Sequence, residues 1–488
     1  MSLNSVLEIG KTGLGVYQTA TEVTGENIAN VNTPGYSRQR VLLETTPTTT
    51  TNGFPLGTGV RIASVERLYD GLLQQQLVAA QSTQGNDTTR ANVLQQIEPT
   101  FNEVANDGLG AAITNFFGSW QDLTLNPAGS TERQTVLSRA QILVDNFHSV
   151  STTLNSAITT QDNALAPLTT DISDKLKNIA QLNGQIKLTQ LVSGNANELK
   201  DQRDQLLRDL STKVGITCAP PNPDDGTVNV TLTGGGQALV TGDKYATMYT
   251  DKVVGAAAPL NDIYLTAVGN PPPAPAAVAG AEITATVGGP KNSLGELGAT
   301  LALRDTIIPG YLGKVDELAN QIVTQVNTVH IGGFDLNGNP GIKFFDFNPA
   351  LGAPPAKAAS NIFVNVATTD QVAAAGSAAT APGDNSNALT LAKLQNKSIA
   401  FTGGSATISS YYDGLVSKVG LDVQSAKNTV SQDNAFTQQL STLRESNSGV
   451  SLDEELTNLV KYQRSYQASA KLINTATEMM DTVIGLIR

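Results

Sequence analysis

The chain is poor in the residues that most often carry covalent or metal chemistry. Cys218 is the only cysteine among 488 residues, which excludes an intramolecular disulfide and a zinc site built from several cysteines. Neither of the two histidines, His148 and His330, lies in an H-E-x-x-H pattern or has a second ligand at metal spacing. We therefore expect structural roles for these three residues, with no metal and no cofactor.

Aromatic and charged residues are also scarce. Only 5% of the residues are aromatic and 15% are charged, a composition that indicates long polar helices and sheets of small residues without a dense aromatic core. The formal net charge of -12 would repel nucleic acid and anionic membranes. Nucleic-acid binding is therefore not expected.

Long apolar runs are absent as well. No stretch approaches the roughly eighteen consecutive apolar residues of a membrane-spanning helix, so no membrane insertion is expected. The first residues, MSLNSVLEIGKTG, lack the basic segment and continuous apolar run of a cleaved secretory signal. We expect the protein either to stay in the cytosol or to leave it by a route that needs no such signal.

What the chain does have is helical periodicity at both ends. Steps of four and three residues near the C-terminus predict a helix with an a/d heptad seam, interrupted at Gln463 and Thr477. The seam holds Leu452, Leu456, Leu459, Tyr466, Ala470, Ile473, Met480, Ile484 and Ile487. Ser451 and Glu454 match a capping box at its start.

The N-terminal repeat has fewer large apolar residues than the C-terminal one. Its apolar seam positions are Leu3, Leu7, Leu14, Tyr17 and Ile28. Glycines at 10, 13, 15 and 25 each cost about 1 kcal/mol of helix stability relative to alanine. We expect both ends to be disordered in the free monomer and to become helical when their narrow apolar stripes find partners.

Further helical spacing fills much of the interior. It covers residues 87–105, 110–124, 131–214, 294–330 and 413–446, with a kink or break expected at Pro167 and a division at Pro309-Gly310. Lys200, Asp204 and Arg208, spaced four apart, are interpreted as a solvated helix face. Residues 216–293 and 331–410 contain alternating apolar residues between clusters of proline and glycine, which favours strands and turns.

These patterns predict a mainly α fold with β-rich insertions. The terminal helices form an α-helical coiled coil, the centre is an elongated helical bundle, and a small β domain or β lobes project from it. The expected division is an inner coiled-coil domain from 1–44 and 449–488, a helical bundle from 45–215, 294–330 and 411–448, a β-rich outer domain at 216–293 and a β-hairpin-rich segment at 331–410. No catalytic constellation can be assembled from the sequence, so no enzymatic activity is expected.

The sharpest local pattern lies just after the N-terminal repeat. Residues Ala29, Asn30, Asn32, Thr33, Pro34, Gly35 and Tyr36 predict a helix end, a turn and the start of an extended segment. Pro34-Gly35 suits the central positions of a type II turn, in which glycine tolerates φ > 0. We interpret this corner as a joint that turns the chain from the inner coiled coil toward the outer domains.

The same residues carry a resemblance to a known family. ANVNTPGYSR at 29–38 and SGVSLDEELTNLVKYQRSYQASAKLINTATEMMDTVIGL at 448–486 resemble the N- and C-terminal signatures of bacterial flagellar axial proteins, which include rod, hook and hook-associated proteins. Within that family, YSRQ at 36–39, SLDEE at 451–455 and GFDLNGNPGIKFF at 333–345 are similar to the hook-associated proteins of the hook-filament junction.

The resemblance implies a non-enzymatic structural adaptor, exported unfolded through the flagellar type III export apparatus and located in the extracellular flagellum. Its implied partners are copies of itself in a ring, the hook protein, the second junction protein (hook-associated protein 3) and an export chaperone that binds the C-terminal seam. Two alternatives stay open: another flagellar axial subunit, such as a hook protein or a flagellin-like protein, and a surface adhesin carried by the β-rich lobes.

Overall fold

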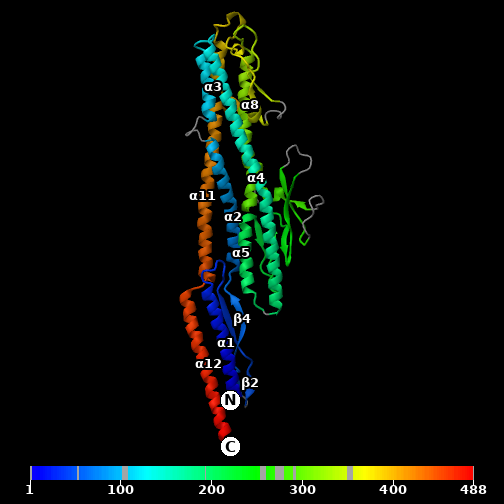
Figure 1. Cartoon of the computed structure of the whole chain (residues 1–488), viewed down its shortest axis with the longest axis vertical. Coiled ribbons are helices and arrows are strands. Elements are labelled where there is room, and N and C mark those ends of the chain that lie inside the picture. The colour runs from blue at the N-terminus through cyan, green and yellow to red at the C-terminus, as the bar shows by residue number, and fades with distance from the viewer. Residues whose placement is uncertain are drawn as a thin grey trace.

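The molecule is long and narrow, and both termini lie at the same end (Figure 1). The computed structural model describes residues 3–51, 54–101, 108–192, 194–252, 260–269, 280–289, 293–348 and 356–486. Its helices are α1 Leu3–Ala29, α2 Gly71–Ile97, α3 Leu109–Leu123, α4 Ser130–Val192, α5 Asn197–Lys213, α6 Thr284–Gly288, α7 Gly295–Ala302, α8 Ile308–Ile331, α9 Ala358–Asn361, α10 Ser386–Lys393, α11 Ile408–Ser448 and α12 Leu452–Leu486. This order confirms a mainly α fold with β insertions.

The strands are short and fall in several small antiparallel sheets. They are β1 Gln39–Thr45, β2 Thr49–Thr51, β3 Phe54–Leu56, β4 Val60–Arg67, β5 Ile216–Cys218, β6 Val230–Leu232, β7 Ala238–Thr241, β8 Lys244–Tyr245, β9 Met248–Lys252, β10 Asn261–Leu265, β11 Ala281–Glu282, β12 Phe345–Phe347, β13 Ile362–Val364, β14 Ile399–Phe401 and β15 Gly404–Ala406. The largest sheet has the order β5-β6-β7-β8, and a second has the order β11-β10-β9.

The lower end is formed by α1 and α12, which run antiparallel beside each other and are called here the terminal helix pair (Figure 1). Two glycines of α1 allow the close approach. A Cβ atom at Gly10 would lie 2.6 Å from Cγ1 of Ile473, and one at Gly13 would lie 2.8 Å from Oγ of Ser469. These glycines cost helix stability. A side chain at position 10 would displace Ile473 and push the two helices apart, whereas one at position 13 would require the hydroxyl of Ser469 to turn away.

A β hairpin lies beside α1 where the sequence predicted the start of the helical bundle. β1 pairs antiparallel with β4, and the register shifts between Leu42 and Leu43. Gly59, with φ of +123°, faces α1 so closely that a Cβ atom would meet the side chain of Thr12. The helical part therefore begins at Gly71 and not at residue 45.

The remaining helices form the helical body, with α2, α3, α4, α5, α7, α8 and α11 as its main elements. The expected break at Pro167 is wrong, because α4 continues through it. Buried Leu165 and Leu168 anchor the helix on both sides, which offsets the roughly 3 kcal/mol that an interior proline costs. The division expected at Pro309-Gly310 is shifted upstream to a π-helical turn, Leu303–Ile307, and Pro309 lies in the first turn of α8.

The interior of the helical body contains a dense cluster of buried aromatic rings, so the expectation of a fold without a dense aromatic core is wrong for this region. Phe116 and Trp120 of α3 pack against Phe344, and Trp120 and Phe344 also contact the ring of His330. Ile342 O lies 2.6 Å from His330 Nδ1, and the Ala373 amide donates to Nε2 at 2.9 Å. Nδ1 therefore holds the proton, and burial lowers the pKa of His330 to about 4. This histidine has the structural role that the sequence predicted.

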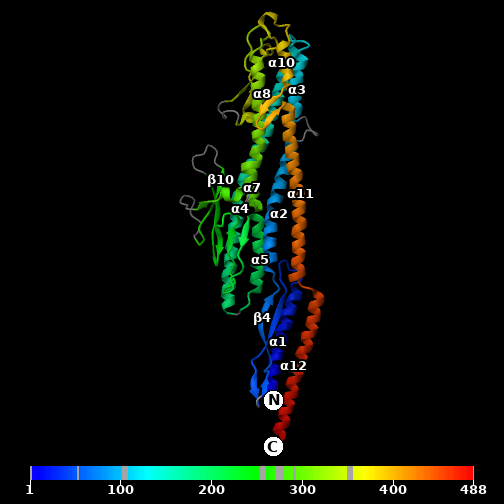
Figure 2. The same cartoon turned by 180° about the vertical axis from the view of Figure 1, so that it is seen from behind.

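The two insertions differ in character. Residues 216–293 carry β5 to β11 and project from the side of α4, as Figure 2 shows from behind. Residues 331–410 contain two hairpins, β12-β13 and β14-β15, but also α10, so this segment is more helical than predicted. None of the helices in the described part of the chain combines the length and hydropathy needed to cross a bilayer.

Candidate functional site at the joint

The predicted turn lies where the terminal helix pair meets the helical body. The Tyr36 amide donates to the Thr33 carbonyl at 3.2 Å, and Gly35 has a φ of +84°, which agrees with the predicted type II turn. A Cβ atom at Gly35 would lie 3.0 Å from Oε1 of Gln205 in α5. Glycine is therefore favoured both by the backbone angle and by the close approach of α5.

Asn27, on the last turns of α1, is the polar centre of the joint. Its Oδ1 accepts from the hydroxyl of Tyr36 at 2.9 Å and from the amide of Gln39 at 2.9 Å. Its Nδ2 donates to the Gln39 carbonyl at 2.8 Å and to Oε2 of Glu455 at 3.1 Å. Because Asn27 is buried and every polar position of its amide is used, loss of any partner would leave a buried group unsatisfied.

Glu455, in the first turn of α12, ties the second terminal helix to the same point. Arg38 donates from Nε to Glu455 at 2.7 Å and from Nη1 to Glu454 at 2.6 Å. The two carboxylates differ in environment, because the side chain of Glu455 is 2% exposed and that of Glu454 is 62% exposed. Glu454, which the sequence suggested as part of a capping box, thus forms a salt bridge with Arg38 across the joint.

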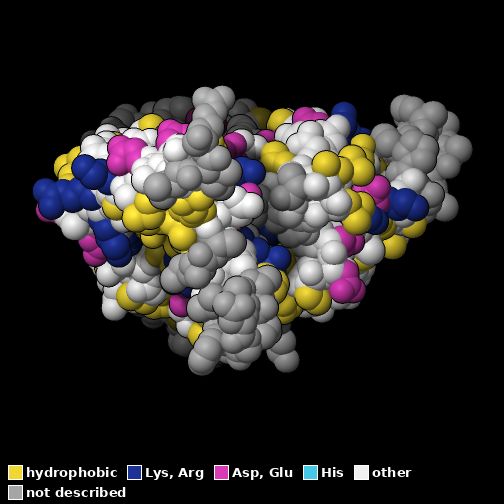
Figure 3. Space-filling model, turned by 90° about the horizontal axis from the view of Figure 1, so that it is seen from below, with side chains coloured by type: hydrophobic (Ala, Val, Ile, Leu, Met, Phe, Trp, Pro, Cys, Tyr) yellow, Lys and Arg dark blue, Asp and Glu magenta, His cyan; other side chains and the backbone are white. Residues whose placement is uncertain are grey.

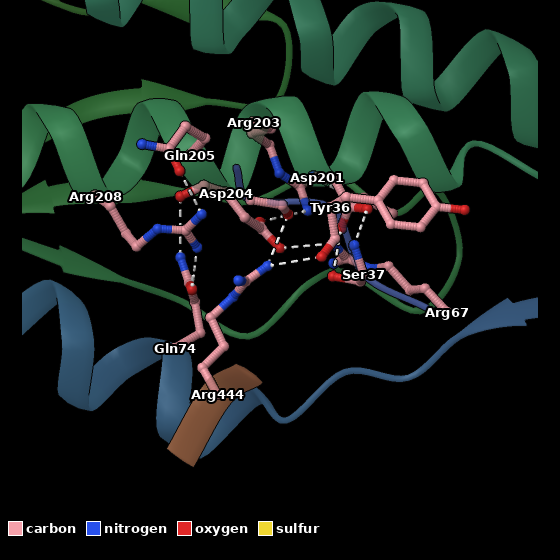
Figure 4. Close-up of polar contacts among 12 residues, drawn as sticks. Tyr36, Ser37, Arg67, Gln74, Asp201, Arg203, Asp204, Gln205, Arg208 and Arg444 are labelled. Carbon is pink, nitrogen blue, oxygen red and sulfur yellow. Dashed lines mark hydrogen bonds and ion pairs between the residues drawn. The ribbon is translucent and has the colours of Figure 1, made fainter. Parts of the chain in front are cut away.

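Ser37 connects the turn to the helical body. Its amide and its hydroxyl each donate to a carboxylate oxygen of Asp201 in α5, both at 2.8 Å. Arg67, at the end of β4, contacts Asp201 at 2.7 Å and Asp204 at 2.8 Å, and Figure 4 shows these side chains converging. Burial raises the pKa of the Asp201 carboxyl, while Arg67 and Ser37 oppose that shift.

A further contact comes from α11. Arg444 donates from Nη2 to the carbonyls of Gly35 at 2.7 Å and Tyr36 at 3.2 Å. On α5, Arg208 donates to Gln74 of α2 at 2.7 Å and to Gln205 at 2.6 Å. The turn is therefore held by side chains from elements far apart in the sequence (Figure 4).

The interpretation of Lys200, Asp204 and Arg208 as a solvated helix face is wrong. Asp204 and Arg208 are buried at the joint, and Lys200 is half-buried. Burial, together with Arg67 and Arg203, lowers the pKa of Lys200. A spacing of four residues identified the shared face correctly but gave no information about what covers it.

A groove of about 530 Å³ opens beside the turn, lined among others by Glu26 of α1, Tyr36 and Glu198 of α5. A hydrogen bond with Glu198, burial and the charge of Glu198 raise the pKa of Glu26. Burial also raises the pKa of Tyr36. The joint thus places two carboxyl groups from different domains against each other.

The predicted seam residues of α1 lie at the edge of its contact with α12. Leu3, Leu7, Leu14, Tyr17 and Ile28 are half-buried, whereas Gly10, Gly13, Val16, Ala20, Thr24 and Asn27 are buried. Tyr17 stacks on Tyr462 with ring centroids 6.5 Å apart. Of the turn residues, Tyr36 is buried, Asn30 and Gly35 are half-buried, and Ala29, Asn32, Thr33 and Pro34 are exposed.

The seam of α12 divides into two groups. Leu459, Ala470, Ile473 and Met480 are half-buried, whereas Leu452, Leu456, Tyr466 and Ile484 are exposed. Ile487 lies outside the described residues. A seam with a repeat of 3.5 residues drifts around a straight helix of 3.6, so one neighbour covers only part of it. Seen from the end that carries the termini, apolar side chains are exposed between polar ones (Figure 3).

Sequence reasoning missed the residues that hold the joint together. Asn27 could have been found, because it continues the buried positions 20 and 24 of α1 as a polar residue. Glu455 was recognised only as part of the SLDEE segment at 451–455. Asp201, Arg67 and Arg444 gave no sequence signal, since their partners lie elsewhere in the chain. Within the described ranges, no group of three or more His, Cys, Asp or Glu side chains could hold a metal ion.

Comparison with known families agrees with this arrangement. The family described as "Flagellar hook-associated protein FlgK helical domain" matches residues 94–345. "Flagella basal body rod protein" matches residues 7–36, and "Flagellar basal body rod FlgEFG protein C-terminal" matches residues 444–486. The latter two segments contain both sides of the contact between Asn27 and Glu455.

Complete relatives and a solved structure extend the match. Flagellar hook-associated protein 1 of Bacillus subtilis (strain 168) is 31% identical over 98% of this chain and 97% of its own. That of Escherichia coli (strain K12) is 26% identical over 99% and 100%. The flagellar hook junction protein FlgK from Burkholderia pseudomallei shares the fold with a TM-score of 0.64 and 18% identity, over 77% of this chain and 100% of that chain. The chain therefore belongs to the flagellar hook-associated protein 1 family, FlgK, of structural flagellar proteins.

Proposed function

We propose that this chain is the adaptor at the hook-filament junction and that its copies assemble into a ring through the terminal helix pair. The supporting observation is the row of exposed apolar side chains on α12, namely Leu452, Leu456, Tyr466 and Ile484. Removing such side chains from water stabilises an assembly by roughly 1.5–3 kcal/mol each. A ring repeats that contribution in every copy.

The joint gives this assembly its geometry. Asn27, Arg38 and Glu455 connect α1, the turn and α12, and Ser37 with Asp201 connects the turn to the helical body. A terminal helix pair fixed in this way would hold the body and its β lobe at a set angle to the tube. Hook protein on one side and the second junction protein, hook-associated protein 3, on the other are the axial partners that this role requires.

Export would place a second demand on α12. We infer that the protein passes unfolded through the type III export apparatus and that a dedicated chaperone first covers the exposed face of α12. An amphipathic helix lying in a groove is the binding mode that suits Leu456 and its neighbours. The chaperone and the ring would then use the same face in succession.

The decisive experiment replaces Leu456, which is 51% exposed on α12, with aspartate. Because this side chain is not part of the buried core, Leu456→Asp should leave thermal unfolding of the monomer unchanged. It should abolish filament attachment, so that flagellin is released into the medium. Leu125→Asp is the matched control, because Leu125 is 84% exposed and comes just after α3, which lies at the end of the molecule far from the termini (Figure 1). Normal filaments with Leu456→Asp would disprove assembly through this face.

Substitutions on the inner side of α12 test a different contact. Ile473 faces Gly10 of α1, so Ile473→Asp and Leu459→Asp should separate the terminal helix pair while the helical body stays folded. Both variants are expected to lose junction assembly and filament retention. Normal motility in both would exclude a role for the pair.

A further inference from the structure

The β lobe carries an outward sheet face that the junction role does not use. β9, β10 and β11 pair so that Tyr249 lies opposite Tyr264, Asp251 opposite Asp262, and Glu282 opposite Tyr264. Because side chains alternate along a strand, these five residues share one face, called here the acidic tyrosine face. Met248, Ile263 and Leu265 point the other way, into the buried core of the lobe, where β9 contacts α4.

The two tyrosines form a flat aromatic surface. Their ring centroids are 5.5 Å apart and the planes are inclined by 17°. Both residues are half-buried, so part of each ring is open to solvent. A stacked pair on a sheet face offers a rigid site for a planar or cationic group, because little conformational freedom is lost when a ligand lies on it.

The carboxylates around the tyrosines lack cationic partners. In the described part of the chain, Asp251, Asp262 and Glu282 make no salt bridge. Arg304, the guanidinium that acts on Asp262, is bound to Asp162 and Asp305. Like charges directly opposite each other on paired strands are destabilising, so the pairing of Asp251 with Asp262 costs stability that an added cation would recover.

The lobe also stands in an accessible place. Figures 1 and 2 both show α4 between the strands and the α2–α11 side of the helical body. We propose that the acidic tyrosine face binds a lysine- or arginine-bearing segment of another protein, with carboxylates pairing the cations and the tyrosine rings stacking on them. This inference goes beyond the junction role and does not depend on it.

The chemistry of the face favours this partner over others. Guanidinium and ammonium groups are attracted to the faces of aromatic rings and form strong charge-assisted hydrogen bonds with carboxylates. A second copy of the chain, with a net charge of -12, is a poor complement. A neutral sugar could stack on the rings but would leave the three carboxylates unneutralised.

The test measures binding of fluorescently labelled hexa-arginine to the full-length chain by anisotropy at low and moderate salt. Asp262→Asn with Glu282→Gln should weaken binding about tenfold at low salt, since each exposed pair contributes up to roughly 1 kcal/mol. Tyr264→Leu, which keeps the charge, should weaken binding about threefold to fivefold through loss of the cation–π contact.

A charge-matched control separates this site from general attraction to an acidic protein. Asp122→Asn with Asp145→Asn removes two exposed charges from α3 and α4 and should change binding less than twofold. Equal weakening by this control, or unchanged binding with Tyr264→Leu, would overturn the proposal. Tighter binding of mannan or maltohexaose than of hexa-arginine would also overturn it, in favour of a glycan surface. Thermal unfolding of each variant checks that the sheet is intact.

Discussion

The terminal helix pair and the helical body are both helical, but they are stabilised in different ways. The body buries large side chains completely, among them Trp120 and Phe116. The pair is held by glycines that allow close approach and by one buried polar cluster around Asn27, while several of its leucines remain exposed. Apolar burial is the dominant stabilising contribution to a fold, so the body can be stable alone, whereas the pair depends on neighbours.

The largest expected difference between the two regions is in local opening. Amides of α1 and α12 in the monomer should exchange with solvent at least about a thousandfold faster than those of α3 and α4, because regions with little apolar burial open at low free energy. Hydrogen exchange with mass spectrometry measures this on the intact chain. Terminal helices as protected as α4, or rigid in a nuclear magnetic resonance spectrum, would contradict the expected disorder of both ends.

A core substitution should affect only the body. Phe116 packs against Phe344 and Phe345 with ring centroids 5.8 and 5.5 Å apart. Phe116→Ala leaves a cavity there and should lower the free energy of unfolding by about 3–5 kcal/mol. Phe436 of α11, 53% exposed, gives the control, because Phe436→Ala should change stability by less than about 0.5 kcal/mol. Denaturant unfolding distinguishes the two variants. Equal losses in the free energy of unfolding would show that the aromatic cluster does not stabilise the body.

Two adjacent glutamates test the joint between the regions. Glu455→Ala removes the buried partner of Asn27 and Arg38 and should cost about 2–3 kcal/mol per assembled copy. Glu454→Ala removes only an exposed contact of the same arginine and should cost less than about 1 kcal/mol. The heat resistance of filament attachment in cells provides the measurement. If both variants detach equally, the buried cluster does not stabilise the joint.

Two glycines separate backbone strain from helix propensity. Gly35→Val forces a β-branched residue into φ of +84° and should cost about 1–3 kcal/mol at the joint. Assembly should suffer while thermal unfolding of the monomer changes little. A Cβ atom added at Gly25 of α1 would meet no other atom within 4 Å, so Gly25→Ala should stabilise α1 by up to about 1 kcal/mol. A large drop in monomer melting temperature with Gly35→Val would assign the turn to the body instead.

The sequence was informative wherever structure depends on residues close together in the chain. Helical spacing located the terminal helices and the body, and Pro34-Gly35 specified its own turn, because φ at these positions is set by the residue itself. The division into domains, by contrast, missed the β1-β4 hairpin. Strand pairing there depends on contact with α1, a distant element that local propensity does not contain.

The joint was only half predictable for the same reason. Its turn was identified from residues 29–36, but the residues that secure it lie far apart in the chain: 164 positions separate Ser37 from Asp201, and 417 separate Arg38 from Glu455. Periodicity alone assigned Asp204 and Arg208 to a solvent-exposed face, but both are buried at the joint. Polar residues on a helix are ambiguous until their cover is known.

The smallest expected effect concerns pH and has opposite signs in the two regions. A hydrogen bond with Glu198, burial and the charge of Glu198 raise the pKa of Glu26 at the joint. The folded joint therefore binds a proton more readily than the separated helices do. Attachment of the pair should therefore weaken as pH rises through that pKa.

In the body, burial lowers the pKa of His330 from 6.5 to about 4, so body stability should fall as pH drops from above 6.5 toward 4. Glu26→Gln removes the repulsion and should strengthen the joint at neutral pH by less than about 1 kcal/mol while leaving the acid response of the body intact. Heat resistance of filament attachment at pH 5 and pH 8 measures the first effect, and thermal unfolding of the monomer measures the second. An attachment that instead weakens on acidification would show that Glu198 does not raise the pKa of Glu26.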